Sequence, residues 1–260
     1  MESMSSIRYA VRDQVAEIQL DSLPVNALNE AMIDDLIGAL RRAAEDDSVR
    51  AVILGSAIPR RFCAGLRLDA VQQSSPSQLY ALVEKLYVGL CEAQFQLKKP
   101  SIAAVEGAAR GGGMTLAISC DMIVAAEDAT FGYPEIDVGM IPAIHYTHLP
   151  RIVGRHRAFD LLFTGRAFDA DEAWRLGLVS RVVPQPDVMR EARALAQSFC
   201  EKSPTIVRMG RAAFLRANDS DYRRGVAGAV ESFGNIAVTD DAKEGVAAFV
   251  EKRKPAWSPG

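Results

Sequence analysis

Long apolar runs, basic tracts and paired cysteines are all missing from this sequence. Nowhere do about 18 apolar residues follow one another without a charge, so no membrane-spanning helix is expected. The four cysteines lie far apart, without a C-x-x-C pair, which indicates neither a metal site nor a disulfide framework. Lys and Arg number 30 against 33 Asp and Glu, and a net charge of -3 argues against a general nucleic-acid binder.

The start of the chain also lacks a targeting signal. Met1–Tyr9 contains no apolar segment of signal-peptide length, and the 260 residues show no internal repeat or low-complexity stretch. This length allows one large domain, with or without a small appendage. These absences predict an untargeted, cytoplasmic protein with neither a membrane nor a nucleic acid as its partner.

A run of three glycines, Gly111–Gly113, joins a buried apolar stretch to a helix of small residues. Positions without a Cβ let a ligand approach the backbone, and a helix start leaves NH groups unpaired beside a partial positive charge. The turn is therefore suited to hold a developing negative charge. Met114-Thr115 replaces the Lys and Ser or Thr of a phosphate loop, and the run does not fit G-x-G-x-x-G. A tight packing turn is the alternative.

Strands and helices alternate through the first part of the chain, and helices dominate from Arg155 onward. Val15–Leu20 alternates apolar and polar residues, a helix capped by Asn29 follows, and 49–54 is a buried strand. This order is typical of a right-handed crossover between parallel strands. Further strands are predicted over 102–105, 122–126, 130–133 and 178–183, a loop over 60–68, and helices over 76–97, 157–163, 171–176, 187–202, 204–217, 222–238 and 241–252. The chain becomes all-helical near residue 185.

Several short motifs stand in a distinctive order. They are Phe62-Cys63-Ala64-Gly65, then Gly107 with the three glycines and Ser119-Cys120-Asp121, then Phe131-Gly132-Tyr133-Pro134-Glu135. Together they resemble the crotonase (enoyl-CoA hydratase/isomerase) family, over nearly the whole chain. The resemblance implies an α/β fold, a crotonase-like spiral of ββα units with a C-terminal helical region. Residues 1–185 would carry the acyl-CoA site, and 186–260 would cover the pocket and join homotrimers or dimers of trimers.

The resemblance also implies a chemistry for the glycine turn. Family members bind acyl-CoA thioesters, with coenzyme A as part of the substrate and with no separate cofactor or metal, and hold the oxyanion with two backbone NH groups. By motif position these donors are Leu66 and Gly112, and the acid/base group is Glu135. Coenzyme A would lie along Val25, Ala27, Ala64, Arg67 and Leu68, and Gly111, Thr115, Pro134 and Tyr146 complete the substrate-binding set.

Thr115 departs from the family pattern. The hydratases that the chain resembles have two glutamates, and the first position is Thr115 here, whose hydroxyl cannot act as a general base at neutral pH. Members with one glutamate, at the place of Glu135, shift a double bond. Double-bond isomerisation is therefore favoured, with hydration as an alternative.

His145 and Tyr146 stand where most relatives have glycines. Either they enter the acyl pocket, where His145 would act as an acid or base in a hydrolase, or they pack at a helix start or a subunit contact. A non-catalytic relative that binds coenzyme A or RNA is the remaining alternative.

Overall fold

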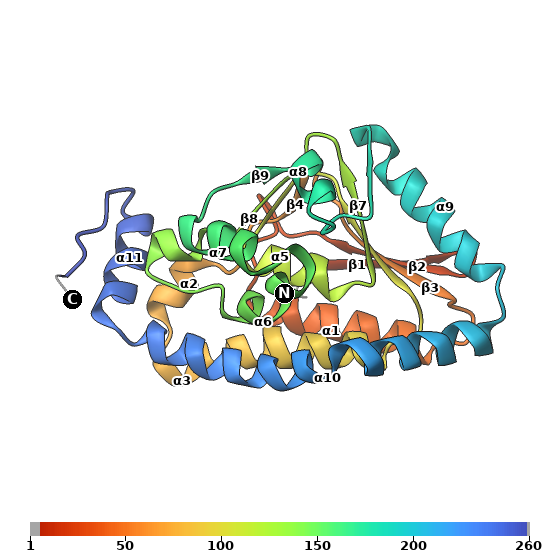
Figure 1. Cartoon of the computed structure of the whole chain (residues 1–260), viewed down its shortest axis with the longest axis horizontal. Coiled ribbons are helices and arrows are strands. Elements are labelled where there is room, and N and C mark those ends of the chain that lie inside the picture. Colours follow the sequence, from red (N-terminus) through yellow and green to blue (C-terminus); the bar gives the residue numbers. More distant parts are fainter. Residues whose placement is uncertain (1–5, 259–260) are drawn as a thin grey trace, which may run out of the picture.

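Two β-sheets form the centre of the molecule, which the computed structural model describes over residues 6–258 (Figure 1). The six-stranded sheet has the order β1 (Ile7–Arg12), β2 (Val15–Leu20), β3 (Ala51–Ser56), β5 (Ser101–Val105), β7 (Met122–Ala126) and β10 (Arg181–Val183). The four-stranded sheet has the order β4 (Arg61–Cys63), β6 (Ala108–Arg110), β8 (Thr130–Gly132) and β9 (Phe168–Asp169). Neighbouring strands are parallel except β1 with β2 and β8 with β9.

Successive strands divide between the two sheets. β3, β5 and β7 enter the larger sheet, and the strands that follow them, β4, β6 and β8, enter the smaller one. Helical segments then return the chain to the next pair, as parallel pairing requires. This repeat is the predicted spiral of ββα units. Because β4 pairs with β6, the segments that follow these two strands lie close together.

The first helices agree with the sequence pattern. α1 (Glu30–Glu45) begins at Asn29, whose side chain accepts a hydrogen bond from the Met32 amide at 2.9 Å. The helix predicted over 76–97 is present as a continuous series, α3 (Pro76–Glu84), a π turn η1 (Lys85–Gly89) and α4 (Leu90–Gln96). The π turn is a local widening that sequence periodicity does not reveal.

The loop predicted over 60–68 is wrong at both ends. Arg61–Cys63 forms β4, because β6 supplies a parallel partner that lies far away in the sequence. Leu68 begins a further short helix, α2 (Leu68–Gln73). Arg60 and residues 64–67 therefore remain outside strands and helices, and residues 64–67 are held at both ends.

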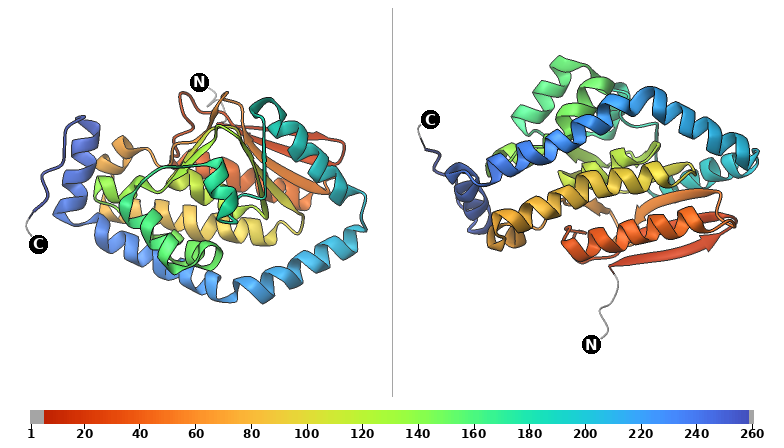
Figure 2. Two further views of the ribbon diagram at one scale, coloured as in Figure 1. Left: turned by 45° about the horizontal axis from the view of Figure 1, so that its top comes forward. Right: turned by 90° about the horizontal axis from the view of Figure 1, so that it is seen from below.

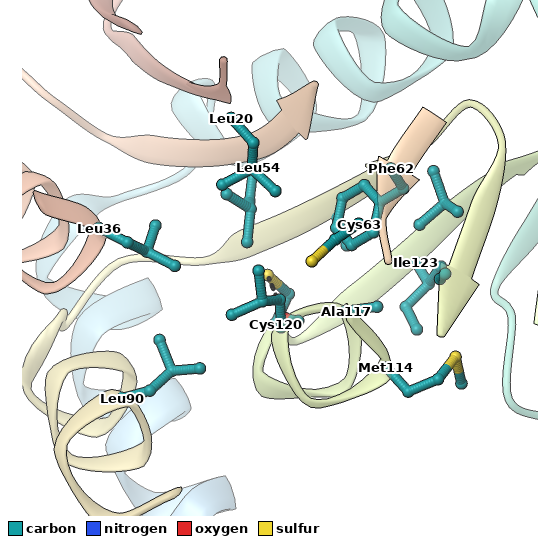
Figure 3. Close-up of a cluster of buried hydrophobic side chains, with 14 of the residues drawn as sticks. Leu20, Leu36, Leu54, Phe62, Cys63, Leu90, Met114, Ala117, Cys120 and Ile123 are labelled. Atoms are coloured by element: carbon teal, nitrogen blue, oxygen red, sulfur yellow. Dashed lines mark hydrogen bonds between the residues drawn. The ribbon is translucent and has the colours of Figure 1, made fainter. Parts of the chain in front are cut away.

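α5 (Gly112–Ser119) is packed inside the core. In Figure 3 its Met114 and Ala117 belong to one apolar cluster with Leu54 of β3, Phe62 of β4 and Leu90 of α4. A helix that is surrounded in this way needs small or apolar residues on all sides. The glycine turn at its start is therefore fixed by close-packed neighbours.

Helices dominate the rest of the chain. They are η2 (Pro134–Val138, a 3-10 turn), α6 (Ala143–Val153), α7 (Arg155–Thr164), α8 (Ala170–Arg175), η3 (Gln185–Asp187, a 3-10 turn), α9 (Val188–Cys200), α10 (Pro204–Ala237) and α11 (Asp240–Val250). α9 packs on β3, β5 and β7, and α10 runs beside α3 and α6 (Figure 2). α11 packs on α2 and η2 at the end of the molecule where the chain finishes.

The two helices predicted over 204–217 and 222–238 are wrong, because a single helix of 34 residues, α10, spans both. Asn, Asp and Ser at 218–221 are poor helix formers, but each costs less than about 1 kcal/mol. Tertiary contacts offset that cost. The Arg151 guanidinium donates to the Asn218 carbonyl, and the rings of Tyr222 and His148 lie 5.5 Å apart.

The strand predicted over 178–183 begins only at Arg181. The amides of Leu178 and Val179 both donate to the Ala173 carbonyl, at 3.0 and 3.3 Å, and so close the end of α8 instead. Among the helices of residues 6–258, not one combines the length and the apolarity that a bilayer crossing requires. The predicted lack of a leader falls partly on residues 1–5, which lie outside the described residues.

Candidate active site

The loop after β4 and the turn after β6 meet at Gly65 and Gly112. A Cβ built on Gly65, whose φ is +89°, would lie 3.1 Å from the Gly112 nitrogen and 2.9 Å from the Arg110 carbonyl oxygen. A Cβ on Gly112 would lie 3.5 Å from the Gly65 Cα. A side chain at Gly65 would force the two backbones apart, so the glycine is what lets them touch.

The backbone NH groups of Leu66 and Gly112 are not used in the hydrogen bonds of the described strands and helices around them. Leu28 donates to the Gly65 carbonyl at 2.7 Å and accepts from the Arg67 amide at 2.9 Å. Because successive residues of an extended segment face opposite sides, the Leu66 amide points away from Leu28. Gly112 is the first residue of α5, where an amide has no acceptor within the helix. Two NH donors without an acceptor among residues 6–258 thus come from adjoining segments.

The peptide between Gly111 and Gly112 has a fixed orientation. The Gly111 carbonyl accepts from the Met114 amide at 2.9 Å and from the Thr115 amide at 3.2 Å, so it points into the first turn of α5. A trans peptide places its C=O and N–H on opposite sides. The Gly112 NH therefore points out of the helix.

Glu135 lies directly against this turn. It belongs to η2, and a Cβ built on Gly111 would lie 3.1 Å from its Oε1. The other carboxyl oxygen, Oε2, is buried and has no hydrogen-bond partner among the described residues. Burial raises the pKa of Glu135 to about 7, against a smaller opposing effect of its own backbone amide. A carboxyl group with that pKa can both take up and release a proton at neutral pH.

Three tyrosines lie near enough to Glu135 to be affected by its charge. Burial is the main cause that raises the pKa of Tyr87, Tyr133 and Tyr146, and the negative charge of Glu135 adds to it in each case. Tyr146, a predicted pocket residue, stacks on Phe163 with ring centroids 5.7 Å apart. Sequence reasoning missed Tyr87 and gave Tyr133 no role of its own. Tyr87 lies in the π turn, which sequence periodicity does not reveal. Tyr133 stands two residues before Glu135 in the same short motif, and this position is the signal that could have pointed to it.

Thr115 and His145 form a second polar pair beside the turn. The Thr115 Oγ1 lies 3.3 Å from the His145 Nε2, and both residues are buried, with 2% and 0% of their surface exposed. The His145 ring lies 4.5 Å from the Tyr133 ring. Burial lowers the pKa of His145 far below its usual value, with a further contribution from the nearby His148. The imidazole is therefore neutral and a weak base, and the hydrolase role of His145 stays an alternative prediction.

The segments predicted to bind coenzyme A are held together by backbone contacts. The Ala64 amide donates to the Val25 carbonyl at 3.1 Å, and the Asn26 side chain donates to the Phe62 carbonyl at 2.8 Å. Ala27 is partly exposed and Ala64 is exposed along this rim. Contact with coenzyme A stays a prediction for these residues.

Arg67 and Leu68 continue the same rim. Arg67 is exposed and forms an ion pair with Asp69 at 2.7 Å, so its charge is partly neutralised. Leu68 starts α2 and packs against the core. Pro134 is the first residue of η2 and places Glu135 at the turn. Their roles in substrate binding also stay predictions.

Other acidic residues that could have faced the pocket lie elsewhere. The Glu106 carboxylate accepts from Gln185 at 3.5 Å and senses the charge of Arg193. Asp137 lies two residues after Glu135, but residues 134–138 form a 3-10 turn rather than an extended strand, so the two side chains do not share a side as they would in a strand. Asp137 is exposed and lies against Gly165. Glu135 is thus the carboxylate of the site.

A cavity of about 840 Å³ lies away from these groups. Its walls come from α4, the end of α5, β7, α6 and the first half of α10, and include Cys91, His148 and Tyr222. Neither Glu135 nor the glycine turn lines this cavity. The glycine turn, rather than this cavity, is therefore the candidate active site, because the Leu66 and Gly112 amides and the titratable carboxyl group are there.

A ββα spiral that places a buried carboxyl group beside a glycine turn defines the crotonase class of fold. The chain belongs to the enoyl-CoA hydratase/isomerase family, whose model matches residues 10–259. It is accordingly an enzyme of the acyl-CoA-transforming type.

Curated and solved relatives agree with this assignment. The chain is 37% identical to the "Probable enoyl-CoA hydratase 2, mitochondrial" of Arabidopsis thaliana, over 94% of this chain and 81% of the relative. It is 36% identical to the crotonyl-CoA hydratase of Syntrophomonas wolfei, over 88% of each chain. A solved enoyl-CoA hydratase/isomerase from Pseudoalteromonas atlantica is similar with a TM-score of 0.86 and 30% identity, over 97% of this chain and 100% of that one.

Proposed function

We propose that the enzyme holds the carbonyl oxygen of an enoyl-CoA thioester with the amides of Leu66 and Gly112 and moves one proton with Glu135. The observation that carries this proposal is the contact between the Glu135 carboxyl group and the glycine turn. A base with a pKa of about 7 lies beside two unpaired NH donors. The two amides would bind the carbonyl oxygen, and Glu135 would move a proton at nearby carbon atoms of the same substrate.

The physical argument concerns the charge that forms when a thioester loses a proton next to its carbonyl. The negative charge moves to the carbonyl oxygen, where fixed NH dipoles stabilise it without reorganising. Losing one such donor costs about 3 to 4 kcal/mol in other enzymes. The NH of Gly112 at the start of α5 also benefits from the partial positive charge of the helix end.

Double-bond isomerisation is the reaction that one carboxylate can complete alone. Glu135 removes a proton from C2 of a 3-enoyl thioester, the electron pair shifts toward the carbonyl oxygen, and Glu135 returns the proton at C4. The product is the conjugated 2-enoyl thioester, and no atom is gained or lost. Thr115, at the place of a second carboxylate, cannot serve as a base, which supports this assignment.

Hydration of a 2-enoyl thioester is the second candidate, because curated relatives are named as hydratases. Here Glu135 would take a proton from water as oxygen adds at C3, and would then deliver a proton to C2. One carboxyl group would perform both steps. The Oε2 atom, buried and unpartnered within the described chain, is available for either reaction.

Assembly as a homotrimer or a dimer of trimers and a cytoplasmic location also stay proposals. Three apolar side chains on the first half of α10, Ile206, Met209 and Phe214, are 68%, 61% and 67% exposed, which supports a subunit contact there. The coenzyme A moiety would enter as part of the substrate, along the rim of residues 25–27 and 64–68.

The test is turnover of crotonyl-CoA and of a 3-enoyl-CoA, followed by the absorbance of the conjugated thioester. Gain of absorbance from the 3-enoyl substrate indicates isomerisation, and loss from crotonyl-CoA indicates hydration. Glu135→Gln should lower kcat for the observed reaction by about 10²- to 10⁴-fold, because it removes the proton carrier. Glu106→Gln is the matched control, since Glu106 is also partly buried but contacts Gln185. Equal rates in the two variants would contradict the proposal.

A further inference from the structure

Three buried polar atoms beside the glycine turn have no hydrogen-bond partner among the described residues. They are the hydroxyl oxygen of Tyr133, Oε2 of Glu135 and Nδ1 of His145. Tyr133 and His145 are both 0% exposed, so bulk water does not contact them. A buried polar atom without a partner destabilises the folded chain, and each such atom therefore needs an explanation. The proton transfer assigned to Glu135 gives no partner to Tyr133 or His145.

Contacts around the first turn of α5 bring the three side chains together. The rings of Tyr133 and His145 have their centroids 4.5 Å apart. The Nε2 atom of His145 lies 3.3 Å from the Thr115 hydroxyl, which leaves Nδ1 as the nitrogen without a partner there. Thr115 donates its amide to the Gly111 carbonyl at 3.2 Å, and a Cβ built on Gly111 would lie 3.1 Å from Oε1 of Glu135. The three atoms thus belong to one cluster of side chains at the candidate active site.

The hydrogen-bonding capacity of these atoms decides what can bind among them. Burial raises the pKa of Tyr133, so its phenol stays protonated and can donate. Glu135 must be deprotonated to act as a base, and a carboxylate only accepts. A hydroxyl group donates and accepts at once, so one hydroxyl oxygen can pair with both of these groups. A carbonyl group would leave Glu135 unpaired, and a second carboxylate would be repelled by it.

We propose that Tyr133, Glu135 and His145 form a specificity subsite that binds one hydroxyl oxygen beside C3 or C4 of the acyl chain. The inference rests on the proposed function and deepens it, because it identifies a polar atom that the acyl chain or its reaction partner must place there. The oxygen comes either from a hydroxyl group of the substrate or from a water molecule that adds at C3. Where the substrate is the source, an acyl group without a hydroxyl leaves buried polar atoms unpaired, which penalises its binding strongly.

The binding test compares butyryl-CoA with 3-hydroxybutyryl-CoA and 4-hydroxybutyryl-CoA by isothermal titration calorimetry. Butyryl-CoA has no hydroxyl group, and none of the three esters has a carbon-carbon double bond to move or hydrate. The absorbance of the conjugated thioester records any loss of water from 3-hydroxybutyryl-CoA. The native enzyme should bind one of the hydroxylated esters about tenfold or more tighter than butyryl-CoA, because a site built to pair a hydroxyl group discriminates against ligands that lack it.

The variants test each side chain of the subsite. Tyr133→Phe removes the hydroxyl and keeps the ring, and should weaken binding of the preferred hydroxylated ester about tenfold while changing that of butyryl-CoA less than about threefold. His145→Phe keeps a flat ring without nitrogens and should reduce the same preference. Tyr9→Phe is the matched control, because its hydroxyl is also buried without a partner among residues 6–258 but lies in β1, where the Arg42 guanidinium covers the ring at 4.1 Å. It should keep the native preference.

Water as the source of the oxygen gives a different result. The native enzyme then binds the three esters equally well but hydrates crotonyl-CoA. Tyr133→Phe should lower kcat for this hydration about tenfold or more with KM changed less than about threefold, whereas Tyr9→Phe keeps both native values. This result supports the subsite and assigns a water molecule as its occupant.

The remaining outcomes each overturn a specific claim. Native binding ratios and native kcat in Tyr133→Phe, with Glu135→Gln slow, overturn the subsite and leave the proposed function standing. A preference that is lost equally in Tyr9→Phe also overturns the subsite. An unchanged preference in His145→Phe, with a native circular dichroism spectrum, overturns the part assigned to His145. A native enzyme that neither binds these esters nor turns over any enoyl-CoA overturns the proposed function, and the subsite with it.

Discussion

Glu135 differs from the exposed glutamates of the chain in what surrounds its carboxyl group. One oxygen lies against the glycine turn, the other has no partner among residues 6–258, and three phenol rings lie within reach of its charge. Burial removes much of the water that would solvate the carboxylate, which is why the pKa rises to about 7. The same loss of water strengthens the attraction of nearby NH dipoles for a substrate oxyanion.

The pH dependence of turnover follows from this pKa. Glu135 starts either proposed reaction as a base, so it must be deprotonated, and kcat/KM should rise with pH through about 7 and then level off. Below the midpoint the rate should fall about tenfold for each pH unit. Initial rates between pH 5 and 9 measure the midpoint. A midpoint near the ordinary glutamate value would show that another group, or a solvated Glu135, carries the proton.

Individual residues differ in how well the sequence could assign them. Glu135, Gly112 and Leu66 follow from short motifs, because close backbone contacts restrict what can occupy those positions. The burial of His145 does not follow, since a histidine after Ile141-Pro142 fits a surface helix start equally well. Tyr87 could not be assigned either, because a π turn shifts which face of the helix each residue occupies.

At the scale of the element, substitutions at Gly112 can distinguish the contribution of its NH group from the effect of adding a side chain. Gly112 is the first residue of α5, a position that accepts proline without breaking a helix. A Cβ there would meet the flexible end of Leu28 at 3.1 Å, so alanine can be accommodated by a small shift. Both substitutions add a side chain, but only proline removes the NH.

We expect Gly112→Pro to lower kcat by about 10²- to 10³-fold, because it deletes one of the two oxyanion donors. Gly112→Ala is the matched control and should lose less than tenfold. Turnover and circular dichroism of both variants provide the measurement. Full activity in the proline variant would mean that the Gly112 amide does not contact the substrate.

The position of Glu135 also depends on how the C-terminal helix, α11, packs against η2. A Cβ built on Gly245 of α11 would lie 2.4 Å from the Val138 carbonyl oxygen, at the end of η2. Gly139, which closes η2 with a φ of +71°, has the Asp241 carbonyl oxygen 2.5 Å from its own built Cβ. The turn that carries Glu135 is thus packed backbone to backbone against α11.

Gly245→Ala should therefore move α11 away from η2, lower the free energy of unfolding by about 1 to 3 kcal/mol and reduce kcat/KM by more than tenfold. Gly228→Ala is the control, since its Cβ would meet nothing within 4 Å in the exposed middle of α10. It should stabilise by up to about 1 kcal/mol, because alanine is the better helix former. Urea unfolding and turnover measure both effects. Comparable behaviour of the two variants would rule out this packing role.

Helices and strands that their own residues determine could be predicted from the sequence. Those that depend on contacts with residues far away in the sequence could not. Asn29 and the apolar stripe after it suffice for α1. β4 exists only because β6 lies beside it, and the continuity of α10 through 218–221 depends on Arg151 and Tyr222 contacts made across the molecule. The glycine turn itself was predictable, since its small residues serve a local backbone geometry.

For the whole molecule, buried titratable groups set how stability changes with pH, and they act in opposite directions. The folded-state pKa of Glu135 is raised from 4.5 to about 7, so its stabilising contribution is complete below pH 4.5 and is lost as pH rises through about 7. The folded-state pKa of His148 is lowered from 6.5 to about 4 by burial and by Arg151. Its contribution is complete above pH 6.5 and is lost as pH falls toward 4.

The acid side of the stability curve should therefore depend on His148, which lies in α6 with its ring 5.5 Å from Tyr222. Between pH 7 and 4.5 the unfolded state gains a proton there that the folded state does not, and this difference costs about 2 kcal/mol. His148→Gln cannot titrate, so its unfolding free energy should fall by about 2 kcal/mol less than that of the native protein over this range. His156→Gln, at an exposed position of α7, is the matched control and should keep the native slope. Denaturant unfolding measures all three at one and the same protein concentration, because the stability of an associating protein depends on concentration. Because the comparison uses slopes, a constant loss of packing in His148→Gln does not enter it. Parallel curves for His148→Gln and the native protein would show that the pKa of His148 is not lowered in the folded state.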